Sequence, residues 1–277
     1  MKIRVGVLPS LITLGNLVSG FAAIGIATYG QLNLDKMIAW RGMDVFAMAG
    51  SLILLAMAFD ALDGKIARMT HLTSEFGAQL DSLCDMVSFG LAPAYVVFLE
   101  ALSNDLFRKD RYAWVCAMLY VVCAALRLAR FNVESTPDEE SHLYFRGLPS
   151  PAAAGVIASL VILHSSGKPD MVWPVAILPF ITVILGGLMM SRVRYVHLLN
   201  ILFQDRKPLV YLVVLVFGLS VLVALAQHFE YILLIGFSGY MLSGPVALAW
   251  TRAGGRTPQA RAPESEDDDS DDPAAIF

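Results

Sequence analysis

The stretch FDALDGKIARMTHLTSEFGAQLDSLCD, residues 59–85, contains four aspartates flanked by apolar segments: Asp60, Asp63, Asp81 and Asp85. On a helix, the first two aspartates lie on one stripe, because they are three residues apart, and Gly64 continues that stripe. The last two are four residues apart and share a stripe with Gly77. Two helices joined by a short turn can bring these stripes face to face. The spacing therefore predicts a helical pair with converging carboxylates.

The rest of the chain has the composition of a membrane protein. Of its 277 residues 57% are hydrophobic and 16% charged, and the mean hydropathy is +0.63. A helix needs roughly 20 apolar residues to cross about 30 Å of hydrocarbon. Eight such runs are present, at about 11–30, 44–62, 76–103, 112–131, 150–166, 171–190, 208–228 and 230–250. The runs are too long and too evenly apolar for barrel strands. We therefore expect an all-α polytopic membrane protein with about eight transmembrane helices.

The spans leave no room for a separate soluble domain, so we expect one transmembrane catalytic domain over residues 1–250. Residues 251–277 differ in character, with seven carboxylates between Glu264 and Asp272. Like-charge repulsion and few apolar residues predict a disordered acidic tail.

The distribution of basic residues predicts the orientation. With eight spans, 14 of the 20 lysines and arginines lie at helix ends and loops on the N-terminal side, and 6 lie on the opposite side. Positive charge concentrates on the cytoplasmic side. We expect both termini and the aspartate cluster to face the cytoplasm of a cell that carries the protein in its inner, cytoplasmic membrane.

Four carboxylates near a bilayer require compensation. Each costs about 2.5–3.5 kcal/mol at a membrane-helix centre on insertion scales, and the four would repel one another. Hard divalent cations prefer carboxylate oxygens, and Mg²⁺ is commonly shared between carboxylates and substrate phosphates. We interpret the cluster as a site for Mg²⁺ or Mn²⁺ that binds a phosphorylated substrate, with Gly64 and Ala67 where the ligand approaches the backbone.

Three other interpretations fit the pattern less well. Solvated helix caps would explain one or two acids better than four. An ion-coupled transporter also uses intramembrane acids, but no inverted repeat carries a second acidic cluster. A non-catalytic scaffold has no need of acids interleaved with glycines.

The pattern D-x2-D-G-x2-A-R-x8-G-x3-D-x3-D is matched without departure by Asp60, Asp63, Gly64, Ala67, Arg68, Gly77, Asp81 and Asp85. In this the chain resembles the CDP-alcohol phosphatidyltransferases. The resemblance implies a six-helix core that is usually dimeric and has its active site open to the cytoplasm. In this chain two further helices follow that core. It also implies transfer of a phosphatidyl group from a CDP-linked lipid to an alcohol, with release of CMP.

The resemblance suggests roles for individual residues. Asp60, Asp63 and Asp81 are similar to the metal ligands, and Asp85 to both a ligand and the general base. Gly64, Arg68 and Ser74 are similar to residues that contact the cytidine diphosphate. Thr13 and Asn16 are polar groups on an otherwise apolar helix, and we expect them to face the nucleotide.

Further stretches resemble the phosphatidylserine synthase branch: LPSLITLGNLVSGFAAIG (8–25), ARFN (129–132), FRGLPSPAAA (145–154) and LGGLMMSRVRY (185–195). Ser10 departs from the asparagine common there. Arginine binds a carboxylate through paired hydrogen bonds, so Arg127, Arg130 and Arg146, with Asn132 beside them, are candidates for binding L-serine.

The predicted partners are thus CDP-diacylglycerol, L-serine, the lipid bilayer and a second copy of the chain, with no nucleic acid. Another acceptor, such as glycerol phosphate or an inositol phosphate, remains an alternative within the family.

Overall fold

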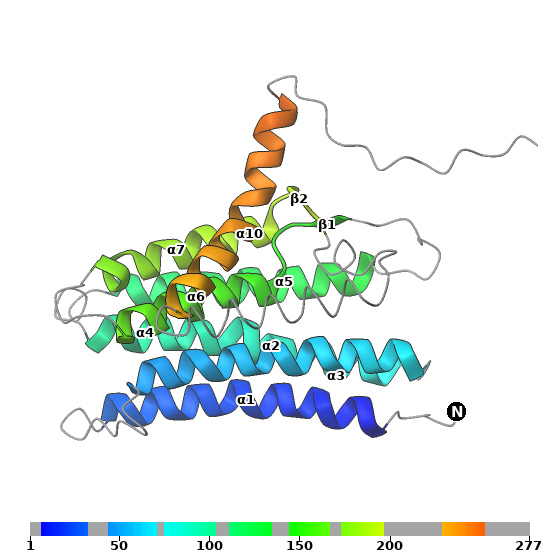
Figure 1. Ribbon diagram of the computed structural model, residues 1–277, viewed down its shortest axis with the longest axis horizontal. Helices are drawn as coiled ribbons and strands as arrows, with labels where there is room; N and C mark the ends of the chain where they lie inside the picture. Colours follow the sequence, from blue (N-terminus) through cyan, green and yellow to red (C-terminus); the bar gives the residue numbers. More distant parts are fainter. Residues whose placement is uncertain are drawn as a thin grey trace, which may run out of the picture.

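The computed structural model describes residues 7–32, 44–70, 75–103, 111–134, 144–166, 173–196 and 229–252. Its elements, in chain order, are α1 (Val7–Leu32), α2 (Val45–Thr70), α3 (Glu75–Asp85), η2 (Met86–Leu91), α4 (Ala92–Ser103), α5 (Tyr112–Glu134), β1 (Tyr144–Arg146), α6 (Ser150–Ser166), α7 (Trp173–Met190), β2 (Arg194–Val196) and α10 (Phe229–Arg252). Helices α1 to α7 lie roughly parallel to one another, and α10 is steeply inclined to them (Figure 1).

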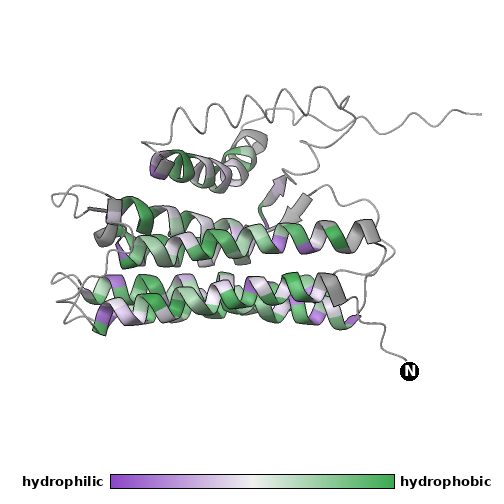
Figure 2. Ribbon diagram, turned by 60° about the horizontal axis from the view of Figure 1, so that its bottom comes forward, coloured by the Kyte–Doolittle hydropathy of each residue, from purple (hydrophilic) through white to green (hydrophobic). Residues whose placement is uncertain are grey.

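The prediction of a helical polytopic membrane protein is confirmed. Five helical stretches are long and apolar enough to cross a membrane: Ser10–Leu32, Val45–Gly64, Glu75–Ser103, Tyr112–Val133 and Glu230–Ala249. Two shorter apolar helices, Ser150–Ser165 and Ile177–Met190, match the fifth and sixth predicted spans. Apolar residues predominate along all of these helices (Figure 2). The predicted span at 208–228 and nearly all of the predicted acidic tail lie outside the described residues.

Small side chains allow the helices to pack closely. Ala23 and Ala27 of α1 and Ala49 and Ala56 of α2 are fully buried. Helix α6 is buried from residue 152 to residue 163 and lies against α2, α7 and α10. The small residues of the AAAG run at its start, 152–155, admit a close neighbour, and the ring of Phe237 on α10 would lie 2.3 Å from a Cβ placed on Gly155.

The third span contains a π-helical turn. Helices α3 and α4 are joined without a break by η2, where the Ala92 N–H donates to the carbonyl of Val87, five residues back. The Phe89 carbonyl in this turn accepts a hydrogen bond from the Tyr120 hydroxyl at 3.0 Å. Single π-turns in α-helices are frequent at functional sites, and this one follows directly after Asp85.

Strands β1 and β2 form a short antiparallel pair, with Phe145 opposite Tyr195. Gly147 follows β1 with a φ of 82° and donates its N–H to the Val193 carbonyl at 2.8 Å. Burial and the neighbouring Tyr240 raise the pKa of Tyr195 in β2 to about 12. The Tyr195 hydroxyl therefore stays protonated, and it donates to the Met241 carbonyl at 3.1 Å.

Candidate metal and active site

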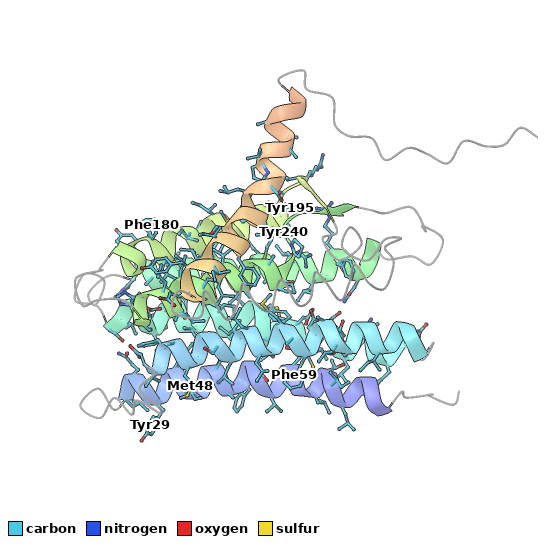
Figure 3. All side chains as sticks on the ribbon, in the orientation of Figure 1. Tyr29, Met48, Phe59, Phe180, Tyr195 and Tyr240 are labelled. Carbon is cyan, nitrogen blue, oxygen red and sulfur yellow. The ribbon has the colours of Figure 1, made fainter. Side chains whose placement is uncertain are left out.

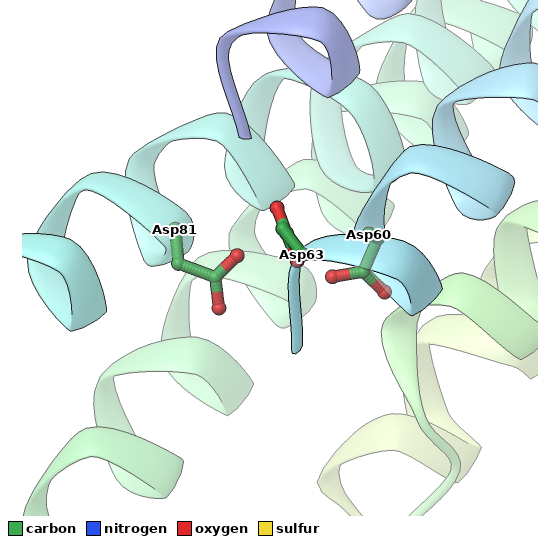
Figure 4. A group of neighbouring side chains, drawn as sticks. All are labelled: Asp60, Asp63 and Asp81. Carbon is green, nitrogen blue, oxygen red and sulfur yellow. The ribbon is translucent and has the colours of Figure 1, made fainter. Parts of the chain in front are cut away.

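The predicted convergence of the acid stripes is observed. Asp60 and Asp63 lie near the end of the membrane-crossing part of α2, and Asp81 lies on α3. Ligand oxygens of these three carboxylates all lie within 4.8 Å of one another. Figure 4 shows the three side chains pointing into the same space from the two helices.

Two oxygens of this cluster lack a hydrogen-bond partner among the described residues. Asp63 is only 5% exposed, and the two atoms are its Oδ2 and the Oδ1 of Asp81. A buried carboxylate without a partner is costly unless an opposite charge or a metal compensates it. Three hard oxygen donors this close suit Mg²⁺ or a similar divalent ion. The triad thus fits a divalent metal.

Helix α1 supports the acids from the other side. The Thr13 side chain forms a hydrogen bond with Asp63, and the Asn16 amide donates to Oδ1 of Asp85 at 3.0 Å. Asn16 is fully buried. Its backbone carbonyl accepts a hydrogen bond from the Ser88 hydroxyl at 3.0 Å. We expected Thr13 and Asn16 to face the nucleotide; in the structure their hydrogen bonds go to the aspartates.

Asp85 differs from the other three acids. It is not a member of the 4.8 Å cluster of Asp60, Asp63 and Asp81, and it ends α3 one turn beyond Asp81. Its oxygen is held by an amide, and the charge of Arg127 on α5 also interacts with it. A carboxylate fixed beside a metal cluster is suited to accept a proton.

Arg127 lies between α5 and the start of α6. Its Nη1 atom donates to the Ser150 hydroxyl at 2.9 Å. Its Nε atom is buried and has no hydrogen-bond partner in the part of the chain that the structure describes, so the guanidinium retains donor capacity for an anionic ligand. Among the candidate arginines, Arg127 has an electrostatic interaction with Asp85.

The structure describes only some of the remaining predicted residues. Arg130 is partly buried, and Asn132 is exposed and accepts the Ser82 hydroxyl at 3.0 Å, next to Asp81. Gly64 has open space where a Cβ would point. The side chains of Ala67, Arg68 and Arg146, and the whole of Ser74, lie outside the described part of the chain.

The residue pattern missed three side chains around Arg127: Ser150, Tyr120 and Tyr240. Ser150 lies between Pro149 and Pro151, and the sequence around it resembles the phosphatidylserine synthase branch without indicating a contact with Arg127. Neither tyrosine is distinguished by any local pattern, because each acts across the fold.

The family model for CDP-alcohol phosphatidyltransferases matches residues 6–188, which include the aspartate cluster, Asn16 and Arg127. The chain belongs to the CDP-alcohol phosphatidyltransferase family. The predicted family is therefore confirmed. CDP-alcohol phosphatidyltransferases generally use a divalent metal, and the triad of this member could bind one.

Three relatives within the family carry one name, CDP-diacylglycerol–serine O-phosphatidyltransferase. The protein of Helicobacter pylori strain ATCC 700392 is 37% identical over 156 residues, 54% of this chain and 61% of its own length. That of Methanocaldococcus jannaschii is 37% identical over 153 residues, 55% of this chain and 66% of its own. The Bacillus subtilis protein is 30% identical over 190 residues, which are 69% of this chain and 90% of its own length.

These names confirm that the chain is similar to the phosphatidylserine synthase branch. The chain spans about three fifths of the length of the Helicobacter relative that it matches.

Proposed function

We propose that this protein transfers the phosphatidyl group of CDP-diacylglycerol to the hydroxyl of L-serine, giving phosphatidylserine and CMP. The observation that carries the proposal is the carboxylate triad with Asp85 one turn further along α3. It occurs in a family member whose relatives carry the name of that serine transferase.

Asp60, Asp63 and Asp81 hold the divalent metal, Mg²⁺ or Mn²⁺, because their oxygens converge and two of them are otherwise unsatisfied. When bound, the ion supplies positive charge that stabilises the diphosphate as CMP leaves. Mg²⁺ and Mn²⁺ both bind carboxylate oxygens. Titrating the activity with each ion identifies the metal that the protein uses.

Asp85 acts as the general base. It takes the proton of the serine hydroxyl as the serine oxygen forms a bond to the lipid-bearing phosphorus. The bond from that phosphorus to the bridging oxygen breaks, and CMP leaves with the electron pair. An alcohol is a weak nucleophile until a positioned base accepts its proton. The hydrogen bond from Asn16 keeps the carboxylate of Asp85 in position.

The serine carboxylate binds Arg127, whose guanidinium retains a free Nε donor and interacts electrostatically with Asp85. Arg130, Arg146 and Asn132 remain further candidates for acceptor binding. On the nucleotide side, the open space at Gly64 admits the diphosphate close to the backbone, and Ala67, Arg68 and Ser74 keep the nucleotide contacts that the family resemblance implies.

Residues 1–250 form one catalytic domain in the cytoplasmic membrane, with both termini and the site on the cytoplasmic side. The excess of basic residues on the N-terminal side of the spans supports this orientation. Two copies assemble as a homodimer, as the family resemblance implies.

The deciding experiment is CMP release by the purified protein given CDP-diacylglycerol, with and without serine and divalent metal. We expect release to require both. Glycerol phosphate or an inositol phosphate as the productive acceptor would overturn the serine assignment. Flux across sealed vesicles without CMP release would instead support the transporter.

Asp85→Asn tests the base. Proton transfer by a positioned base contributes about 10²–10⁴-fold, so turnover should fall at least about 100-fold while metal binding persists. Glu75→Gln is the matched control, because Glu75 is an exposed acid at the start of the same helix. Near-normal serine transfer by Asp85→Asn would refute the assignment.

A further inference from the structure

Helix α10 lies beyond the family-matched residues 6–188 and yet packs beside the candidate site. It contacts α6 and β2. The ring of Phe237 occupies the space above Gly155, where a Cβ would lie 2.3 Å from it. Since α6 begins at Ser150, the partner of Arg127, this contact fixes α10 against the helix that carries one side of the acceptor pocket.

Tyr195 fixes the position of α10 along its own axis. Its hydroxyl donates to the Met241 carbonyl at 3.1 Å, and its ring would lie 2.6 Å from a Cβ on Gly244. The same ring packs on Tyr240, with centroids 5.8 Å apart and planes inclined by 40°. Figure 3 shows Tyr195 and Tyr240 side by side where α10 crosses the bundle.

This packing places Tyr240 within electrostatic range of Arg127. The Tyr240 side chain is partly buried, and it interacts electrostatically with the guanidinium of Arg127. The same guanidinium interacts with Asp85 and donates to Ser150. Arg127 on α5 therefore interacts electrostatically both with Tyr240 of α10 and with Asp85 at the end of α3.

A phenol is suited to this place. It is neutral, so it does not cancel the charge that Arg127 offers to an anion, and its oxygen can accept an N–H while its own hydrogen is donated elsewhere. An aspartate there would pair with the guanidinium and compete with the acceptor carboxylate.

We propose that α10 completes the acceptor pocket by placing Tyr240 as a positioning residue, which orients the guanidinium of Arg127 toward the carboxylate of the acceptor amino acid. The inference rests on the proposed function. It goes beyond that function because it assigns a part of serine recognition to a helix outside the family core.

The test is the kinetics of Tyr240→Phe in the full-length protein. Interacting polar groups of one network are energetically coupled, so loss of the phenolic oxygen that interacts with Arg127 should raise the KM for serine on the order of 10-fold. The KM for CDP-diacylglycerol and the thermal unfolding temperature should be unchanged. Tyr231→Phe, at an exposed position on the same helix, is the matched control and should leave all three values unchanged.

A purely structural role gives a different result. Tyr195→Phe removes the bond to Met241 and should lower the unfolding temperature. If Tyr240→Phe lowers that temperature as well, or raises both KM values equally, the positioning role is refuted. Equal kinetics of Tyr240→Phe and Tyr231→Phe would also refute it. Absence of serine-dependent CMP release in the unaltered protein is the separate outcome that removes the proposed function, and this inference with it.

Discussion

Replacement of Asn16 by alanine tests whether α1 holds the catalytic base. The Asn16 amide lies 3.0 Å from Oδ1 of Asp85 and is fully buried, so water cannot readily replace it. A hydrogen bond to a charged group contributes about 1.5–3 kcal/mol. Because each 1.36 kcal/mol is about tenfold in rate, we expect the turnover number to fall roughly 10- to 150-fold.

The assay is CMP release at saturating serine and CDP-diacylglycerol, with each KM measured separately. The loss should be in turnover, because Asn16 contacts the proton acceptor. Asn16→Asp should cost more, since it places a second carboxylate against Asp85. The control is Ser19→Ala, one turn further along α1. Among the hydrogen bonds described for Ser19, its hydroxyl donates only to the Gly15 carbonyl of the same helix.

A turnover within twofold of normal would refute the positioning of Asp85 by Asn16. A change confined to the KM for CDP-diacylglycerol would return Asn16 to the nucleotide contact that the apolar helix pattern first suggested. The two readouts thus separate support of the base from binding of the donor substrate.

Three further results are expected. Asp63→Asn should raise the Mg²⁺ or Mn²⁺ concentration for half-maximal activity at least about tenfold, because a triad ligand loses its charge; an unchanged metal titration would exclude Asp63 as a ligand. Gly20→Ala should destabilise the fold by about 1–3 kcal/mol in thermal unfolding, since its Cβ would lie 2.7 Å from the Ser88 Cα, whereas Gly25→Ala meets nothing within 4 Å; equal stabilities would contradict this. Arg127→Lys should raise the KM for serine more than that for CDP-diacylglycerol, because lysine lacks the planar fork, and parallel changes would argue for a structural arginine.

Much of the fold follows from local sequence. Runs of about 20 apolar residues determine where helices cross the membrane, and the predicted runs coincide with the helices wherever the structure describes them. The aspartate triad was also predictable, because helical spacing alone places Asp60 with Asp63 and aligns Asp81 on the next helix. The signature spacing requires no knowledge of distant contacts.

The rest of the site depends on contacts between distant residues. Asn16 and Asp85 are 69 residues apart, and no periodicity within α1 indicates that its amide turns toward an acid. The three residues around Gly147 that link β1 to α6 look like a simple chain break. Only the pairing with β2 shows that they also place Ser150 against Arg127. The link from α10 to the site requires β2 as well, through Tyr195.

The π-helical turn at Met86–Leu91 has a consequence for insertions and deletions. Each residue of an α-helix turns the chain by about 100°, and a π-turn accommodates one residue more than the α-helical repeat. Loss of one residue within η2 would therefore return the turn to the α-helical repeat and remove the bond from the Ala92 N–H to the Val87 carbonyl, while Asp81 and Asp85 keep nearly the same face relative to α4. A one-residue deletion in η2 should thus be tolerated better than one within α4, which would rotate both aspartates by about 100° against the rest of that helix.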